Sequence, residues 1–233
     1  MKLYFKPGAC SMASHITLQE IGAPFETEAV DTAAGTTASG ADYRRINAKG
    51  YVPTLQLDDG EILTEGPAIL QYLADSAPET GLAPATGTLD RARTMEQLNF
   101  VATELHKAFS PLFRESSSDA SKAQAKKNVR ARFDTVEALL ADGRETLVPG
   151  QFTIADAYLF VVANWANFTG IPLPEWPNLA RFMERTAARP SAGPSMAAGP
   201  PLFVRPRTSA SGSAFCAVVT MARVMLPVAL GLI

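Results

Sequence analysis

In the first 80 residues, short apolar segments change several times between the alternating pattern of strands and the spacing of helices. Residues 2–6 are aromatic and apolar and stop at a Pro-Gly pair, and residues 25–30 alternate apolar and polar side chains as a strand does. An Asp-Asp-Gly turn joins two further apolar segments, which is a hairpin pattern. The expected strands are 2–6, 25–30, 54–57 and 61–63, the expected helices are 11–21, 41–47 and 67–76, and a loop is expected over 33–41. This order predicts a small mixed α/β sheet with helices on its faces.

The second part of the chain shows helical spacing only. Residues 79–88 have the composition of a linker, and after them Val129, Phe133, Val136 and Leu140 recur at i, i+4, i+7 and i+11. Helices are expected over 89–113, 119–142, 154–168 and 177–188. The pattern therefore predicts an α/β domain over 1–80 and an all-helical domain over 87–190.

Residues 191–233 differ from both domains in composition. From residue 190 onward there are six prolines but no Lys, Asp, Glu, Asn or Gln. We favour a shifted reading frame of a GC-rich gene as the origin of this tail, with a disordered natural extension as the next alternative. A membrane anchor over 214–233 is disfavoured by Arg223, which costs about 2.5–3.5 kcal/mol at the centre of a membrane helix, and by Pro227. Cys216 is then a bystander thiol.

Composition and charge exclude several classes of protein. The 233 residues carry a net charge of −2, so bulk electrostatics do not support nucleic-acid binding. Two cysteines cannot form a disulfide framework, which indicates a reducing compartment and a cytoplasmic protein. The chain has only two histidines, so a metal site built mainly from histidines would also need carboxylate ligands. No metal is expected. Residues 2–5 lead on from Met1 without the extended apolar region of a signal peptide.

Two positions near the first helix and the hairpin could carry chemistry. Cys10 lies at the expected start of helix 11–21, where free amides and the helix dipole would lower its pKa; the alternative is a small buried hydrophobic residue. The Val52-Pro53 bond, at a strand start, could be cis and turn the Val52 backbone toward an extended peptide ligand. The alternative is an ordinary trans proline.

Two further groups could form a ligand site. Glu65, just before helix 67–76, could bind an ammonium group, and the free amides of that helix could bind a carboxylate; the alternative is that Thr64 and Glu65 only cap the helix. Asn99, Thr103 and His106 would share one helix face, as a cleft wall or as a solvated surface with one histidine.

A capping pattern begins the apolar helix 154–168. Thr153 and Asp156 have the S/T-x-x-D/E spacing, in which each residue satisfies an amide at the helix start. The amides of a buried helix need such partners, so we expect these residues to matter for folding and not for chemistry.

Together these segments resemble the bacterial beta-class glutathione S-transferases over residues 1 to about 190. The resemblance rests on KLYFKPGACS at 2–11, NAKGYVP at 47–53, LTEGPAILQY at 63–72 and FTIADAY at 152–158. It implies a thioredoxin-like N-terminal domain followed by an all-helical C-terminal domain, with glutathione bound mainly by the first domain of a homodimer. It implies catalytic roles for Cys10 and His106, and glutathione binding by Cys10, Tyr51, Val52, Pro53, Glu65, Gly66, Asn99, Thr103, Glu104, Leu105 and His106.

Two positions depart from the pattern of the family. Position 66 is usually Ser and is Gly66 here, so one hydroxyl for the γ-glutamyl carboxylate is missing. Losing such a bond to a charged group would weaken binding by roughly 1.5–3 kcal/mol. Position 35 often carries Lys and is Gly35 here. We therefore expect weak glutathione binding, with a dissociation constant above the low-micromolar range.

The resemblance implies a transferase that conjugates reduced glutathione to hydrophobic electrophiles. Thiol–disulfide exchange through a mixed disulfide on Cys10 is a second activity that it suggests. A non-catalytic ligand-binding or stress-response protein of the same fold is the alternative, and isomerase or dehalogenase activities of related folds remain open. No membrane or nucleic-acid partner is expected.

Overall fold

A computed structural model describes residues 1–193. The N-terminal part contains a five-stranded sheet of order β3-β2-β1-β4-β5, in which β1 and β2 are parallel and the other neighbours are antiparallel. Its strands are β1 (Lys2–Phe5), β2 (Glu26–Asp31), β3 (Thr36–Thr37), β4 (Thr54–Gln56) and β5 (Ile62–Thr64). The mixed sheet and the hairpin are confirmed. The prediction of a loop over 33–41 is wrong in part, because this segment contains the short strand β3.

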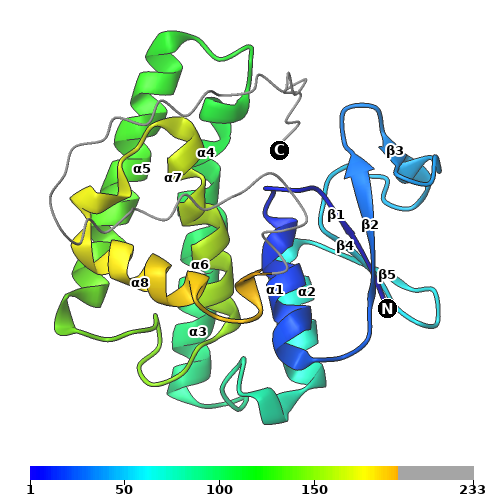
Figure 1. The fold of residues 1–233 in the computed structure, drawn as a ribbon, viewed down its shortest axis with the longest axis horizontal. Helices are drawn as coiled ribbons and strands as arrows, with labels where there is room; N and C mark the ends of the chain where they lie inside the picture. Colours follow the sequence, from blue (N-terminus) through cyan, green and yellow to red (C-terminus); the bar gives the residue numbers. More distant parts are fainter. Residues whose placement is uncertain (194–233) are drawn as a thin grey trace, which may run out of the picture.

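The two faces of the sheet pack against different groups. Leu3 and Leu55 lie in the main core, on the face that α1 (Ser11–Ile21) and α2 (Gly66–Ser76) cover (Figure 1). Tyr4 points the other way and packs with Tyr43, in the 3-10 turn Tyr43–Arg45. Because both faces are covered, the ends of β1 and β4 are fixed in position. The loops that carry Cys10 and Val52 follow and precede these strands.

The C-terminal part is all helical, as predicted. Its elements are α3 (Leu89–Phe100), a π-helical turn (Val101–Leu105), α4 (His106–Phe113), α5 (Asp119–Leu139), α6 (Ile154–Asn164), α7 (Ala166–Thr169) and α8 (Pro177–Ala187). Every residue of α6 is buried, and this helix packs on both α1 and α3 (Figure 1). The capping box of Thr153 and Asp156 at the start of α6 is confirmed.

The helix expected over 89–113 is interrupted by the π-helical turn. Residues Val101–Leu105 form this turn, whose wider ring shifts every later side chain around the helix axis. No glycine or proline within the turn indicates it in the sequence. The expected common face of Asn99, Thr103 and His106 assumed a regular α-helix, so the turn changes which residues lie together.

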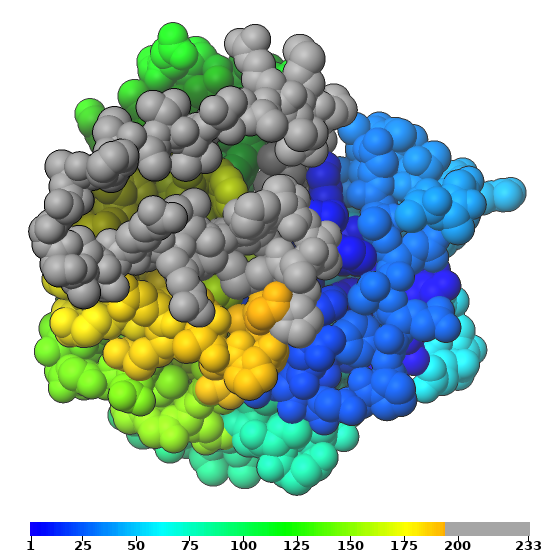
Figure 2. All heavy atoms as spheres, viewed as in Figure 1, coloured from blue at the N-terminus to red at the C-terminus, as the bar shows by residue number. Residues whose placement is uncertain are grey.

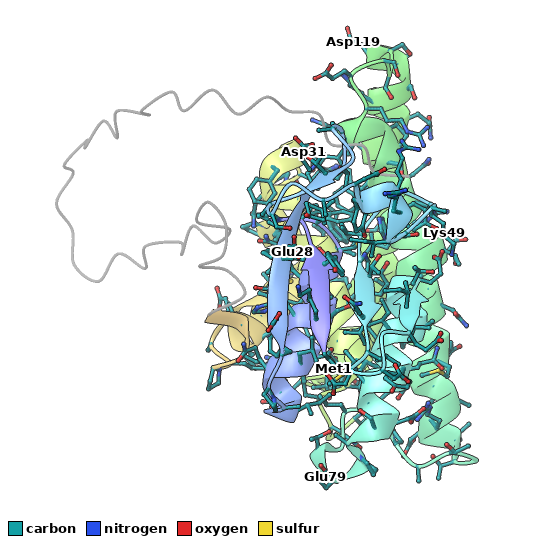
Figure 3. All side chains as sticks on the ribbon, turned by 90° about the vertical axis from the view of Figure 1, so that its right-hand side faces the viewer. Met1, Glu28, Asp31, Lys49, Glu79 and Asp119 are labelled. Atoms are coloured by element: carbon teal, nitrogen blue, oxygen red, sulfur yellow. The ribbon has the colours of Figure 1, made fainter. Side chains whose placement is uncertain are left out.

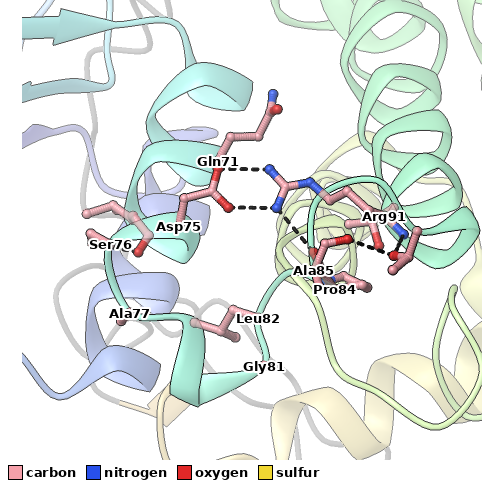
Figure 4. Close-up of polar contacts among 12 residues, drawn as sticks. Gln71, Asp75, Ser76, Ala77, Gly81, Leu82, Pro84, Ala85 and Arg91 are labelled. Carbon is pink, nitrogen blue, oxygen red and sulfur yellow. Dashed lines mark hydrogen bonds and ion pairs between the residues drawn. The ribbon is translucent and has the colours of Figure 1, made fainter.

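The two domains lie side by side and are linked by specific contacts (Figure 2). The Arg91 guanidinium donates to both carboxylate oxygens of Asp75, at 2.6 and 2.9 Å, and also to the Pro84 carbonyl, which ties the linker to α2 and α3 (Figure 4). Near the end of the described chain, the Arg189 guanidinium donates to the Glu20 carboxylate of α1 at 2.7 and 2.9 Å. These contacts hold the domains in one arrangement.

Candidate functional site

Cys10 directly precedes α1 and is buried. Its side chain is 8% exposed, and the thiol donates to the Val52 carbonyl at 3.6 Å. Burial raises the pKa of Cys10 to about 12, whereas the amides of Cys10 and Ser11 act in the opposite direction. The prediction of a lowered pKa is therefore wrong, because desolvation of the thiolate outweighs the helix terminus. Cys10 is a neutral thiol in this structure.

The Val52–Pro53 peptide bond is cis, as the sequence suggested. The preceding loop is fixed by Tyr43, whose hydroxyl donates to the Tyr51 carbonyl at 3.0 Å, and by Asn47, whose amide donates to the same carbonyl at 2.8 Å. Val52 lies beside Cys10, so the loop and the start of α1 form one wall of the candidate site.

Glu65 occupies an uncommon backbone conformation at the start of α2. Its φ of 72° lies in the left-handed region, which non-glycine residues rarely adopt and which recurs at functional sites. The side chain makes no capping hydrogen bond, so the alternative of a simple helix cap is wrong for Glu65. The free amides of the first turn of α2 remain available for an anion.

The Glu65 carboxylate is held by two neighbours from the loop before β4. The Lys49 ammonium and the Tyr51 hydroxyl each donate to its Oε1 at 2.5 Å. These bonds, that from Lys49 first, lower the pKa of Glu65, so the carboxylate is ionised at neutral pH. About half of the side chain is exposed, and Lys49 lies on the side of the sheet that carries β4 and β5 (Figure 3). A bound ammonium group would share this carboxylate with Lys49.

His106 is partly buried, at the start of α4. Its Nδ1 is 2.7 Å from the Tyr158 hydroxyl, and its ring packs edge-on against Trp165 with centroids 4.8 Å apart. Burial, with a smaller contribution from Lys107, lowers the pKa of His106 to about 4. The alternative of a surface histidine is therefore wrong, and the imidazole is neutral at neutral pH.

The four other candidates from this helical segment have separate surroundings. Asn99 and Thr103 are exposed, and the Thr103 hydroxyl donates to the Asn99 carbonyl at 3.0 Å. Glu104 pairs with Arg132 at 2.8 Å on the surface. Leu105 is fully buried in the core, which leaves only its backbone for a ligand. Because of the π-helical turn, the inward-facing His106 does not share the exposed face of Asn99 and Thr103.

Tyr158 is a further candidate for the site that the sequence analysis does not single out. Its hydroxyl reaches the N-terminal domain: a Cβ added to Gly66 would lie 3.9 Å from this hydroxyl and 3.9 Å from Pro53 Cγ. A neighbouring bond also joins the domains, because Trp165 Nε1 donates to the Gly8 carbonyl at 2.8 Å, just before Cys10. The sequence places Tyr158 in the FTIADAY segment and in an apolar helix, and the one signal for a further role is its polar end, which requires a partner when buried.

The comparisons with known proteins match both halves of the chain. The glutathione S-transferase N-terminal domain family matches residues 8–76, and the C-terminal domain family matches residues 100–190. Glutathione S-transferase GstA of Escherichia coli O157:H7 is 46% identical over 199 residues, which cover 85% of this chain and 98% of that protein. The chain belongs to the glutathione S-transferase family.

Solved structures agree with this assignment of a glutathione S-transferase. A ternary complex of BphK, a bacterial member, has a TM-score of 0.83 at 46% identity and covers 85% of this chain and 98% of that chain. A sphingomonad glutathione S-transferase complexed with glutathione has a TM-score of 0.82 at 45% identity, with the same coverage. A beta-class enzyme of Sphingomonas chungbukensis is equally similar in fold, at 44% identity. The resemblance to the beta class and the predicted two-domain fold are confirmed.

Within residues 1–193, no cluster of three or more His, Cys, Asp or Glu side chains could hold a metal ion. In the same part of the chain, no helix is long and apolar enough to cross a bilayer. The expectations for the tail, a shifted reading frame or a disordered extension with no membrane anchor over 214–233 and with Cys216 as a bystander, concern residues 194–233, which lie outside the described residues.

Proposed function

We propose that this glutathione S-transferase conjugates reduced glutathione to hydrophobic electrophiles. The observation that carries the proposal is the meeting of both domains at one site. Tyr158, hydrogen-bonded to His106, lies beside Gly66 and Pro53, while Cys10 contacts Val52. The sphingomonad relative was solved in complex with glutathione, and its fold is shared over 85% of this chain. We extend that ligand to this chain.

The residues suggest how the tripeptide would be held. The backbone of Val52, which lies beside Cys10, would pair with the extended cysteinyl residue of glutathione. The γ-glutamyl ammonium would bind Glu65, and the γ-glutamyl carboxylate would bind the backbone amide of Gly66 at the start of α2. Asn99, Thr103 and Glu104 would contribute from the exposed side of the second domain.

In the proposed reaction the glutathione sulfur, and not Cys10, is the nucleophile. The thiolate of glutathione attacks the electrophilic carbon, a bond to the leaving group breaks, and the leaving group departs with the electron pair. Because Cys10 is a neutral thiol, its S–H can donate to the glutathione thiolate and stabilise it. His106 would supply a second donor beside the sulfur.

Thiol–disulfide exchange through Cys10 is a secondary activity in this proposal. The position of Cys10 beside Val52, where the cysteinyl part of glutathione would lie, supports a mixed disulfide. The thiolate of Cys10 would have to attack the sulfur of oxidised glutathione, releasing one glutathione thiolate. The raised pKa makes that thiolate scarce, so this exchange would be slow relative to conjugation.

Replacing Cys10 separates the two activities. In Cys10→Ala, we expect conjugation of glutathione to 1-chloro-2,4-dinitrobenzene to fall about three- to tenfold, because one weak donor is lost. Intact-mass analysis after treatment with oxidised glutathione should show no adduct at position 10. Cys10→Ser, which restores a donor, should recover part of the rate. Loss of all conjugation in both folded variants would show that Cys10 is the nucleophile and contradict the proposal.

We also propose a cytoplasmic homodimer with a role in detoxification. Four large apolar side chains are exposed on the described surface, Ile62, Tyr72, Leu89 and Phe168, of which Leu89 is 64% exposed. A second copy of the chain that covered such side chains would remove their apolar surface from water. Sedimentation of the protein should give twice the chain mass, and a concentration-independent monomer would contradict the dimer.

A further inference from the structure

The Tyr158 hydroxyl is buried where the two domains meet. The side chain is 3% exposed and comes from α6, the central helix of the second domain. Its hydroxyl lies 2.7 Å from Nδ1 of His106 and next to the first residue of α2, Gly66. Gly66 also lies beside Pro53, and the preceding residue, Val52, accepts a hydrogen bond from the Cys10 thiol, so the Tyr158 hydroxyl lies close to the N-terminal wall of the site.

In the hydrogen bond between the Tyr158 hydroxyl and His106 Nδ1, the chemistry of the two groups decides which atom is the donor. Burial keeps both groups neutral, since it raises the pKa of Tyr158 well above its ordinary value and lowers that of His106 to about 4. A phenol O–H is a stronger donor than a neutral imidazole N–H, and an imidazole nitrogen is a stronger acceptor than a phenol oxygen. The Tyr158 hydroxyl therefore donates to Nδ1, which leaves the imidazole proton on Nε2.

The imidazole ring is also held in orientation. It packs edge-on against Tyr158, with ring centroids 6.0 Å apart and an angle of 87° between the ring planes. It also packs edge-on against Trp165, with centroids 4.8 Å apart and an interplanar angle of 75°. Trp165 is itself fixed by its bond to the Gly8 carbonyl, two residues before Cys10. A ring turned by 180° would lose the bond to Tyr158, so Nε2 stays on the opposite side of the ring from the hydroxyl.

We propose that Tyr158 is a positioning residue that holds His106 as the Nε2–H tautomer and thereby presents an N–H donor to the sulfur of bound glutathione. The hydrogen bond that one ring nitrogen accepts decides where the proton of the other resides. An unprotonated Nε2 would face a thiolate with a lone pair and oppose its formation. The delivery to sulfur rests on the proposed function, whereas the tautomer is a property of the free protein.

The tautomer is tested directly on the free wild-type protein. Nitrogen-15 NMR of labelled histidine distinguishes protonated from unprotonated ring nitrogens, and comparison with His106→Leu assigns the signals of His106. We expect Nδ1 unprotonated and Nε2 protonated at pH 7. A protonated Nδ1, or an equal mixture of tautomers, would overturn the proposal whether or not the protein conjugates glutathione.

A double-mutant cycle tests whether Tyr158 acts through His106. In the wild-type background, Tyr158→Phe should lower kcat for conjugation about tenfold, equivalent to about 1.4 kcal/mol, with little change in the KM for glutathione. In the His106→Leu background the same change should have less than about a twofold effect. Equal losses in both backgrounds would overturn the proposal.

The spectrum of bound glutathione gives a second readout. Tyr158→Phe should reduce the ultraviolet thiolate absorbance of the glutathione complex at neutral pH, whereas an unchanged absorbance would contradict the proposal. Tyr4→Phe is the matched control, because the Tyr4 hydroxyl bonds to Gln56 at 3.1 Å on the sheet, away from His106. An inactive wild type with the expected tautomer would count against the proposed function alone.

Discussion

Asp156→Ala should lower the free energy of unfolding by about 2–6 kcal/mol. The Asp156 carboxylate is fully buried and accepts the backbone N–H groups of Leu147, at 2.7 Å, and of Thr153, at 2.8 Å, besides the Thr153 hydroxyl. Each buried N–H left without a partner costs about 1–3 kcal/mol, and the variant leaves two of them. The loss is amplified structurally because Asp156 caps α6, on which both α1 and α3 pack.

Urea unfolding followed by circular dichroism measures this loss. Asp119→Ala is the control, since Asp119 also lies in the first turn of a helix, α5, but is exposed. The control should change stability by less than about 0.5 kcal/mol. A comparable change in the two variants would contradict the role assigned to the capping box. The folded fraction of Asp156→Ala should keep the conjugation activity of the wild type per molecule, because Asp156 acts on folding and not on chemistry.

Gly66→Ser should tighten glutathione binding about 10- to 100-fold. The serine hydroxyl would add a hydrogen bond to the γ-glutamyl carboxylate, and a bond to a charged group contributes roughly 1.5–3 kcal/mol. The structure has room for the side chain, because a Cβ at this position would meet Pro53 and Tyr158 only at 3.9 Å, an ordinary contact. Gly66 also begins α2 without a positive φ, so a serine there is not strained.

Calorimetric titration with glutathione measures the change. Gly66→Ala is the matched control, because it adds the Cβ without the hydroxyl, and its affinity should stay within about threefold of the wild type. Equal affinities of the Ser and Ala variants would show that the hydroxyl makes no contact with the ligand. A wild-type dissociation constant in the low-micromolar range would already contradict the expected weak binding.

Local features of the sequence predicted most of the fold. The strand expected over 25–30, the Asp-Asp-Gly hairpin and the Thr153–Asp156 capping pattern depend on neighbours within a few residues, and all three are confirmed. The cis bond before Pro53 was also anticipated. The strand β3 was missed because it is two residues long and its pairing with β2 carries little pattern of its own.

The site was less predictable because it depends on contacts between distant segments. The pKa of Cys10 is set by burial of the thiol, which opposes the local effect of the helix start. His106 turns inward because the π-helical turn before it rotates the following helix, and its partner Tyr158 lies 52 residues further along the chain. Residue spacing along the chain does not indicate either contact. The sequence could therefore identify Cys10 and His106 as candidates but could not predict their pKa values.

Steady-state conjugation tests the central claim most directly. With 1-chloro-2,4-dinitrobenzene as the electrophile, the wild-type protein should give a rate above the uncatalysed reaction that saturates with glutathione. Glu65→Gln should raise the KM for glutathione at least about tenfold, since it removes the charge that the ammonium group would bind. A rate no higher than that without protein, or a KM unaffected by Glu65→Gln, would contradict the account.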